Sequence, residues 1–320
     1  MRVLVTGGAG FIGSHVARLL REREKADVTV LDNLSVGQRG SVPDGCRLVV
    51  GDLNDPMALA RALDGIDTVV HLAAFVSIRG SFERPEEDLR TNCCGTLSLF
   101  RASVDAGVKK IVFASSMAVY GEPTALPVSE GSPTLPGSPY GLSKLRGEMW
   151  GRILAAKYGI EFAALRYFNT YGQGQTPSDY VGVITTFVAC AVAGRPMTVY
   201  GDGEQTRDFV WVEDVAQATL LAIRQGVQGV FNVGSGREVS INEIARLVQR
   251  SAGGRIVHVT APPGEVRRMC ADISRARRLL GYAPRGQLEE QIPLLVQHWR
   301  SRQDRSPAAG SRVTAGWRAT

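Results

Sequence analysis

Two side chains four residues apart could together move a proton. Tyr140 and Lys144 are the first and last residues of a Tyr-Gly-Leu-Ser-Lys run, and on a helix residues i and i+4 lie on one face. A neighbouring ammonium stabilises phenolate, so it should lower the pKa of Tyr140 and make the phenol a general base. Because this spacing is common, the alternative is an exposed helix that simply carries a tyrosine and a lysine.

Ser115 and Ser116 supply hydroxyl groups upstream of this pair. They follow the strand-like run 110–114, and the sites of parallel sheets collect at the carboxyl ends of strands. We predict that Ser116 hydrogen-bonds the reacting oxygen of a substrate and assists the proton transfer. Ser115 is the nearby competitor, and an ordinary loop serine is the alternative.

A glycine-rich turn near residue 10 is typical of dinucleotide binding. Gly7, Gly10 and Gly13 stand between a strand-like run, 3–5, and a helical pattern that begins at Phe11. Without side chains the backbone can turn tightly and approach a pyrophosphate, to which the helix amino terminus presents N–H groups and a partial positive charge. Since the turn joins a strand to a helix, we interpret it as a cofactor site rather than a plain turn.

Two aspartates extend this interpretation. Asp32 ends the second strand-like run, where a carboxylate accepts hydrogen bonds from the adenosine ribose and repels a 2′-phosphate. This predicts NAD rather than NADP, with turn formation beside Asn33 as the alternative. Asp52 could hold the adenine amino group, or it could cap the loop in which it stands.

Short β-rich runs alternate with helical stretches through the first half of the chain. We predict strands at 3–5, 28–31, 47–50, 68–72, 110–114 and 162–167, and helices at 11–21, 57–63, 86–106 and 140–158. This alternation favours an α/β fold, a Rossmann-type doubly wound parallel sheet that brings the strand ends to one edge.

The pattern changes after Gly172. Helices predicted at 183–193, 213–224 and 241–252, short strands at 198–200, 208–211 and 231–233, and a last helical region indicate a smaller C-terminal α/β substrate-binding domain. We therefore divide the chain into a dinucleotide-binding domain at 1–172, to which some later segments return, a mainly substrate-binding domain at 173–300, and a flexible tail at 301–320.

Charge and cysteine content exclude several classes of protein. The formal net charge is +6, and part of it lies in the predicted tail, so we expect no nucleic-acid binding. The five cysteines are odd in number and form no CxxC pair, which predicts neither disulfides nor a metal site and suits the cytoplasm. Since there is no signal-peptide pattern and no apolar run of roughly 18 residues, we expect no membrane segment.

Nine motifs in a fixed order resemble a known superfamily. They are GGAGFIGSH, LDNLS, GDL, HLAA, ASSMAVYGEP, SPYGLSK, LRYFNTYG, GDGEQTRDFVWVEDV and NVGSG, and the resemblance runs from Met1 to about Trp299. Together they resemble the extended short-chain dehydrogenase/reductase superfamily and its NAD-dependent epimerase/dehydratase family. Within that family they look most like the UDP-glucose (UDP-galactose) 4-epimerase branch.

The resemblance implies an isomerase that inverts C4 of a UDP-hexose, with N-acetyl and uronic forms left open. In that family NAD stays tightly bound, hydride leaves C4, and a 4-keto sugar rotates before hydride returns to its opposite face. Ser116, Tyr140 and Lys144 fall on the catalytic positions. The family's cofactor contacts fall on Gly7, Gly10, Phe11, Ile12, Gly13, Asp32, Asn33, Ser35, Asp52, Leu53, Leu72, Ala73, Ala74, Asn92, Tyr140, Lys144, Tyr167 and Phe168.

The resemblance also implies a set of substrate contacts. These fall on Ser116, Asn169, Arg207, Met269 and Tyr200, the last in the segment beside the uracil. An arginine suits a diphosphate because its planar fork can bind two oxygens. The alternatives are an ion pair with Asp208 or Glu204 for Arg207, turn formation for Asn169, and plain packing for Met269.

Three departures help to choose a branch. Met117 and Ala118 stand where related dehydratases carry an acidic pair and decarboxylating relatives a glutamate, which disfavours both reactions. Pro262 replaces the family's diphosphate-binding arginine, with Arg267 or Arg268 as candidate substitutes. Enzymes limited to simple hexoses can carry a bulky tyrosine where this chain has a flexible methionine, so UDP-N-acetylglucosamine stays open.

Two rival functions and a quaternary prediction complete the hypothesis. One rival is a dehydratase or reductase acting on a dTDP-, GDP- or CDP-linked sugar. The other is a non-catalytic NAD-binding regulator, against which the intact Tyr140 and Lys144 argue. Apolar stripes in helices 86–106 and 140–158 predict a homodimer of the kind that family forms, while inner packing is the alternative for most of those residues.

Overall fold

The larger part of the chain is a seven-stranded parallel sheet in the order β10-β6-β5-β4-β1-β2-β3. The computed structural model describes residues 1–175, 182–261 and 266–305. The strands are β1 (Arg2–Thr6), β2 (Asp27–Asp32), β3 (Arg47–Val50), β4 (Thr68–His71), β5 (Lys110–Ser116), β6 (Glu161–Tyr167) and β10 (Gly229–Val233). The strand order reverses between β1 and β4, which is the switch point where such sheets bind ligands.

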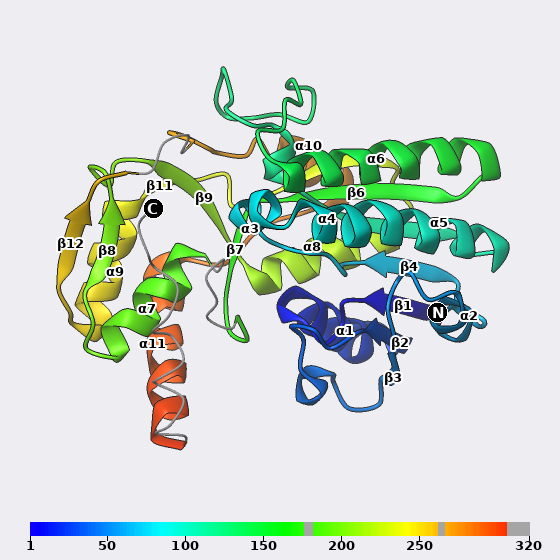
Figure 1. Ribbon diagram of the computed structural model, residues 1–320, viewed down its shortest axis with the longest axis horizontal. Coiled ribbons are helices and arrows are strands. Elements are labelled where there is room, and N and C mark those ends of the chain that lie inside the picture. Colours follow the sequence, from blue (N-terminus) through cyan, green and yellow to red (C-terminus); the bar gives the residue numbers. More distant parts are fainter. Residues whose placement is uncertain (176–181, 262–265, 306–320) are drawn as a thin grey trace.

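Helices cover both faces of this sheet because successive strand residues point to opposite sides. Val3 and Val5 of β1 pack in one core cluster with residues of α1 (Phe11–Glu24) and α8 (Val212–Arg224). Leu4, which lies between them, packs instead with α2 (Pro56–Leu63) and α5 (Thr96–Asp105). The chain therefore has the doubly wound α/β fold that its sequence predicts (Figure 1).

The region predicted as one helix at 86–106 consists of three segments. They are α4 (Pro85–Asp88), a π-helical stretch η2 (Leu89–Gly95) and α5. The unpredicted α3 (Ile78–Glu83) precedes them, and α6 (Pro139–Tyr158) packs against all of these segments. Two 3-10 turns, η1 (Arg39–Ser41) and η3 (Met117–Val119), lie in loops after β2 and β5. A π-helical turn inside a helix often marks a functional site.

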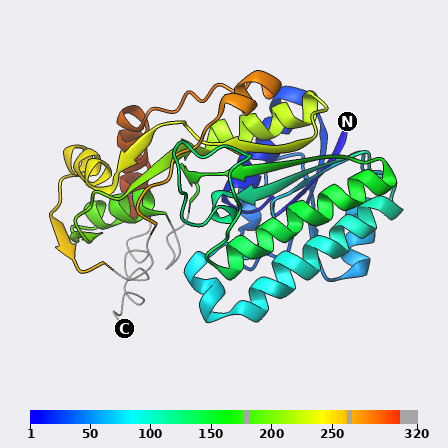
Figure 2. The same cartoon turned by 90° about the horizontal axis from the view of Figure 1, so that it is seen from above.

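The smaller part lies beside the carboxyl edge of the large sheet (Figures 1 and 2). Its strands form the sheets β11-β9-β7 and β12-β8. They are β7 (Asn169–Tyr171), β8 (Met197–Tyr200), β9 (Thr206–Trp211), β11 (Glu238–Ser240) and β12 (Ile256–Val259). The helices α7 (Val183–Val192), α9 (Ile241–Ala252) and α11 (Leu288–Arg305) pack together around a third hydrophobic cluster.

Segments from the second half of the chain return to the first sheet. Strand β10 pairs with β6, α8 packs on α1, and α10 (Ser274–Leu280) packs on β10. The last helix reaches Arg305, so it runs past residue 301, where the tail was predicted to start. Leu295 and Val296 anchor α11 in the third cluster, which explains why the helix continues. The rest of the predicted tail, 306–320, lies outside the described residues.

In the described part of the chain, no helix is long and apolar enough to cross a membrane. Nor do the residues of 1–175, 182–261 and 266–305 bring three or more His, Cys, Asp or Glu side chains together as a metal site would need. The cysteines are free thiols.

Candidate active site

The turn between β1 and α1 fits a phosphate-bearing ligand. Gly7 has φ +70°, and a Cβ there would lie 2.7 Å from the backbone nitrogen of Ala73. A Cβ on Gly13 would lie 2.1 Å from the carbonyl oxygen of Gly7. Helix α1 begins at Phe11, and its N-cap residue, Gly10, provides no side-chain cap; its first turn has no acidic residue. Its first N–H groups have no partner within the helix and carry a partial positive charge, so they can bind an anion.

Asp32 is hydrogen-bonded to this turn. Its carboxylate accepts hydrogen bonds from the Ala9 N–H at 3.0 Å and from the Leu34 N–H at 2.9 Å. The side chain is buried. It therefore caps the turn after β2, as the alternative interpretation holds, and also lies directly against the glycine turn. Each carboxylate oxygen has a second lone pair that a ribose hydroxyl could use.

Asp52 lies across from Asn33 at the next strand end. Asn33 Nδ2 donates to Asp52 Oδ2 at 3.1 Å, and the Asn54 N–H donates to Asp52 Oδ1 at 2.9 Å. Burial raises the pKa of Asp52, but hydrogen bonds from Asn54 and Asn33 outweigh it and leave the pKa lowered. The carboxylate thus caps its own loop, as one interpretation of the sequence proposed. Leu53 beside it is buried, and Ser35 donates its N–H to Asn33 Oδ1.

The loop after β4 closes the other side of the glycine turn. Leu72 and Ala73 donate their N–H groups to the carbonyl and hydroxyl oxygens of Thr6, at 3.1 and 3.2 Å. Asn92 holds the next part of this loop, because its Oδ1 accepts from Phe75 N at 2.8 Å and its Nδ2 donates to Phe75 O at 3.0 Å. Ala74 lies between these anchors. Asn92 therefore shapes the predicted cofactor loop from η2.

Two other predicted cofactor residues lie where β6 ends. The Tyr167 hydroxyl lies 2.7 Å from Thr219 Oγ1 on α8, so this side chain points into the core rather than into the cleft. Phe168 is also buried, and its N–H donates to Val233 O. At these two positions the backbone, not the side chain, is what a ligand could contact. Phe11 and Ile12 form the first turn of α1 and are half-buried.

The serine, the tyrosine and the lysine meet at the carboxyl end of β5. Ser116 is its last residue, and Tyr140 and Lys144 lie in the first turns of α6, which Ser138 caps. Ser116 and Tyr140 are hydrogen-bonded through their side chains. The Lys144 ammonium donates to Ala114 O at 2.9 Å and lies 5.8 Å from the centre of the Tyr140 ring. Tyr140 and Lys144 are buried and Ser116 is half-buried, and a phenol, an ammonium and a hydroxyl placed together can move a proton to and from a substrate oxygen.

The competitor Ser115 is engaged elsewhere. Its hydroxyl donates to Glu148 Oε1 at 2.5 Å, and Glu148 also receives two hydrogen bonds from Arg166 at 2.8 and 2.7 Å. These three side chains are buried. The geometry therefore favours Ser116 over Ser115. Glu148 was not predicted, although it lies four residues after Lys144 on α6, a spacing that would have placed it on the same face.

The pKa of Tyr140 differs from the one that its spacing from Lys144 predicts. Burial raises the pKa of Tyr140 to about 12, even though the Ser116 hydrogen bond acts to lower it. Burial lowers the pKa of Lys144 to about 8. The tyrosine pKa is thus raised rather than lowered as expected, because the free-energy cost of removing the phenolate from water exceeds the stabilisation that its neighbours supply. The phenol keeps its proton at neutral pH.

The smaller part of the chain carries the polar side chains that the resemblance assigns to the substrate. Asn169 begins β7, and its buried Oδ1 has no hydrogen-bond partner among the described residues. Tyr200 ends β8, and Arg207 lies in β9 and donates to Thr206 O at 2.7 Å. An orphaned buried acceptor is costly unless a ligand satisfies it, so Asn169 is the clearest mark of a substrate site.

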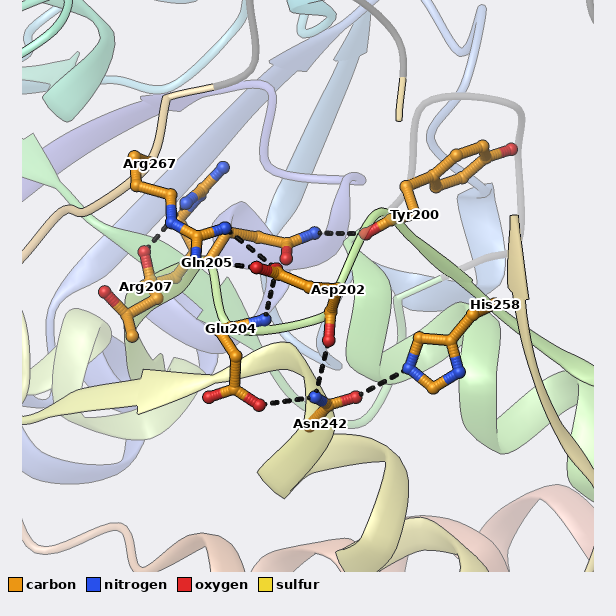
Figure 3. Close-up of polar contacts among 9 residues, drawn as sticks. Tyr200, Asp202, Glu204, Gln205, Arg207, Asn242, His258 and Arg267 are labelled. Atoms are coloured by element: carbon orange, nitrogen blue, oxygen red, sulfur yellow. Dashed lines mark hydrogen bonds and ion pairs between the residues drawn. The ribbon is translucent and has the colours of Figure 1, made fainter. Parts of the chain in front are cut away.

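The rival partners of Arg207 are occupied. Asp208 accepts hydrogen bonds from Ser235, Gly236 and Ala271, and Glu204 accepts from Asn242. Figure 3 shows Asn242 holding the 201–205 turn between Tyr200 and Arg207, together with His258 and Gln205. The predicted substrate residues Tyr200 and Arg207 therefore flank a turn, 201–205, that these hydrogen bonds hold in place; we call it the braced turn.

The structure places the two candidate diphosphate arginines, Arg267 and Arg268, and also Met269. Pro262 lies outside the described residues. Arg267 binds Asp202 of the braced turn through both its terminal nitrogens, at 2.8 and 2.9 Å, whereas Arg268 binds Glu238 on β11. Met269 is 2% exposed and packs in the first core cluster, which favours its packing interpretation over a role in contacting the sugar.

A parallel sheet with a glycine-rich first turn and a Ser116–Tyr140–Lys144 set at the end of β5 defines an enzyme of the extended short-chain dehydrogenase/reductase class. The chain belongs to the NAD dependent epimerase/dehydratase family, whose sequence profile matches residues 3–234.

Named relatives cover nearly the whole chain. A putative UDP-glucose 4-epimerase of Methanocaldococcus jannaschii is 40% identical over 95% of this chain and 100% of its own length. The crystal structure of a Thermotoga maritima UDP-glucose 4-epimerase with UDP-glucose has a TM-score of 0.91 and 37% identity, covering 94% of this chain and 99% of that one. A UDP-N-acetylglucosamine 4-epimerase of Methanobrevibacter ruminantium, with UDP-N-acetylmuramic acid, has a TM-score of 0.88 and 34% identity, covering 94% and 98%.

Proposed function

We propose that this enzyme inverts the C4 hydroxyl of a UDP-hexose with the help of NAD. The observation that carries the proposal is the Ser116–Tyr140–Lys144 set in a chain of this family, with no carboxyl group in the segment that follows Ser116. The residues after Ser116 form η3 and are Met117 and Ala118, which supply no carboxyl group for eliminating water. UDP-glucose and UDP-galactose are the substrates we favour, and N-acetyl and uronic forms stay open.

The residues of the glycine turn fit the pyrophosphate of NAD, and Asp32 fits its adenosine ribose. When bound, NAD supplies a hydride acceptor and a positive charge to the site. A carboxylate at the end of β2 also disfavours the 2′-phosphate of NADP, because both groups are anionic. The Ala73 backbone, held against Gly7, completes the wall of the cofactor cleft.

The protein's own residues handle the proton. Ser116 hydrogen-bonds the C4 oxygen. Tyr140 must first lose its own proton, which the positive charges of Lys144 and of bound NAD would favour, and as a phenolate it takes the hydroxyl proton while the carbon loses hydride, so that C4 becomes a ketone. Lys144 places a positive charge beside the phenolate before the transfer, and the transfer turns that phenolate back into a neutral phenol. The keto sugar would then turn over in the site, so that hydride and proton return to the opposite face of C4, whose configuration is inverted.

Substrate binding falls to the smaller part of the chain. Asn169 supplies an unsatisfied acceptor, Tyr200 an aromatic surface for the uracil, and Arg207 a guanidinium for the diphosphate. We favour Arg267 over Arg268 as the second diphosphate arginine. Thr206 N donates to Arg267 O at 3.0 Å, so Arg267 comes from a segment paired with the start of β9, next to Arg207.

The decisive experiment is incubation of the purified protein with UDP-glucose, UDP-galactose and their N-acetyl and uronic forms. Chromatography or NMR should show interconversion of at least one pair at C4, without net production of NADH. If none interconverts, the proposed function is wrong. Net NAD(P)H turnover or a released keto sugar with dTDP-, GDP- or CDP-sugars would favour the rival reductase or dehydratase.

We further propose that the enzyme is a cytoplasmic homodimer. Leu142, Met149, Trp150 and Ile153 are exposed apolar residues of α6, and their spacing places them along one side of the helix. Such a stripe suits a second copy better than water. Free thiols at every cysteine suit a reducing compartment.

A further inference from the structure

Asp88 is a buried carboxylate that the reaction described above does not use. It is the last residue of α4, and 2% of its surface is exposed. Asn92 Nδ2 donates to its Oδ2 at 2.8 Å, and Ser143 hydrogen-bonds it from α6. Burial raises the pKa of Asp88, while these hydrogen bonds and the charge of Lys144 act to lower it. Burying a carboxylate costs free energy unless the charge is paired or hydrogen-bonded.

The cluster places this carboxylate beside the catalytic helix. Asn92 Nδ2 lies 3.2 Å from Ser143 Oγ, and Ser143 Oγ donates to Tyr140 O at 2.9 Å. Ser143 immediately precedes Lys144, and Asp88 lies close enough to Lys144 for their charges to interact. The same Asn92 holds the loop after β4 through Phe75. One carboxylate is thus anchored to the cofactor loop, to η2 and to α6.

The surroundings of Lys144 make this charge important. Burial lowers the pKa of Lys144 to about 8, and the charge of Asp88 acts in the opposite direction. Two other titratable groups lie near Lys144, namely His71 from β4, whose pKa burial lowers to about 3, and Tyr140, while Cys93 from η2 interacts with Asp88. At neutral pH these three groups are uncharged. Of the carboxylates in the described part of the chain, Asp88 is the one whose charge raises the Lys144 pKa.

We propose that Asp88 is a positioning residue whose negative charge keeps the buried Lys144 protonated beside Tyr140. Without this charge the ammonium would lose its proton near working pH, and the phenolate would lose its stabilising partner. The consequence for catalysis rests on the proposed function, but the charge state of Lys144 can be measured without any substrate.

The chain offers a direct measurement because it has only five lysines, Lys25, Lys109, Lys110, Lys144 and Lys157. Labelling the lysine ε-carbons with ¹³C gives few NMR signals, and a Lys144→Arg variant assigns the signal of interest. In Asp88→Asn the titration midpoint of Lys144 should fall by about one pH unit, the lower end of what removing a close opposite charge produces. Asparagine keeps the size and can still accept from Asn92.

Two further variants complete the design. Glu86→Gln removes the same charge from an exposed position of α4 and should leave the Lys144 midpoint unchanged, because water screens it. Asp88→Glu keeps the charge and should keep the midpoint closer to wild type than Asp88→Asn does. If Asp88→Asn does not fold, Asp88→Ser gives the same comparison with a smaller side chain.

Activity supplies the second readout. Removing an anion lowers the pKa of both Lys144 and Tyr140, so the whole pH profile of kcat in Asp88→Asn should move to lower pH. Above about pH 8, a shift of one unit would reduce kcat about tenfold. An unchanged Lys144 midpoint in folded Asp88→Asn overturns the inference, whatever the enzyme catalyses. A shifted midpoint in a protein that interconverts no UDP-sugar supports it and removes only the proposed function.

Discussion

Tyr140 is the residue on which the proposed reaction depends most directly. In Tyr140→Phe the ring still fills its buried place, but the proton acceptor is gone, so kcat should fall by about 10² to 10⁴-fold. The amount of co-purifying NAD and the unfolding temperature should stay near wild type. A coupled assay for sugar interconversion measures kcat, absorbance measures the bound NAD, and calorimetry measures the unfolding temperature. Activity within tenfold of wild type would show that another group carries the proton.

Lys144 should make stability depend on pH. Its pKa is about 8 in the folded chain against a usual 10.5, so the unfolded chain binds more protons between these values and stability rises with pH in that window. The difference in unfolding free energy between wild type and Lys144→Met should therefore grow by about 3 kcal/mol from pH 8 to 10.5. Urea titrations at several pH values measure it.

A lysine elsewhere on the same helix is the control for this measurement. Lys157 is exposed near the end of α6, so Lys157→Met should show no comparable dependence on pH. If both variants behave alike, burial does not set the pKa of Lys144 in the way described.

At the scale of elements, one buried ion pair joins β5, α6 and β6. Glu148 on α6 accepts from Ser115 on β5 and from Arg166 on β6. Glu148→Gln leaves the Arg166 charge buried without its counter-ion, so it should destabilise the protein by about 3 to 5 kcal/mol. Glu213→Gln breaks an exposed pair with Arg18 and should cost at most about 1 kcal/mol. Equal losses in urea unfolding would contradict this difference.

The β1–α1 turn gives a second prediction at this scale. A methyl group in Gly13→Ala would lie 2.1 Å from Gly7 O, and backbone cannot yield as a flexible side chain can. The variant should lose bound NAD and about 1 to 3 kcal/mol of stability. Gly137→Ala meets nothing within 4 Å and serves as the control. Retention of NAD by Gly13→Ala would show that the helix does not approach the strand this closely.

At the scale of the whole molecule, the proposed homodimer can be tested through the exposed apolar stripe of α6. If the α6 stripe is the interface, Ile153→Glu should halve the mass measured by light scattering, because burying the new charge is costly. Leu294→Glu changes an exposed leucine on α11 and should leave the mass unchanged. A wild-type monomer at micromolar concentration would refute the proposed assembly.

Sequence patterns alone determined most of the first domain. Strands buried on both faces read as short apolar runs, and the glycines, Asp32, Ser116, Tyr140 and Lys144 stand at strand ends or on one helix face, where local spacing is informative. Because parallel strands end at one edge, these residues could be placed together without coordinates. The α/β fold, the family and NAD as the cofactor followed from the same patterns, and the residues of the NAD site stay a prediction.

Only the tertiary structure decided what depends on distant partners. Ser115 was excluded by Glu148, Met269 was placed in the core, and the orphaned oxygen of Asn169 became visible. Asp88 lies more than fifty residues before Lys144, so no spacing could join them. Burial, which sets the pKa of Tyr140 and Lys144, is a property of everything packed around a group, and a linear pattern does not contain it.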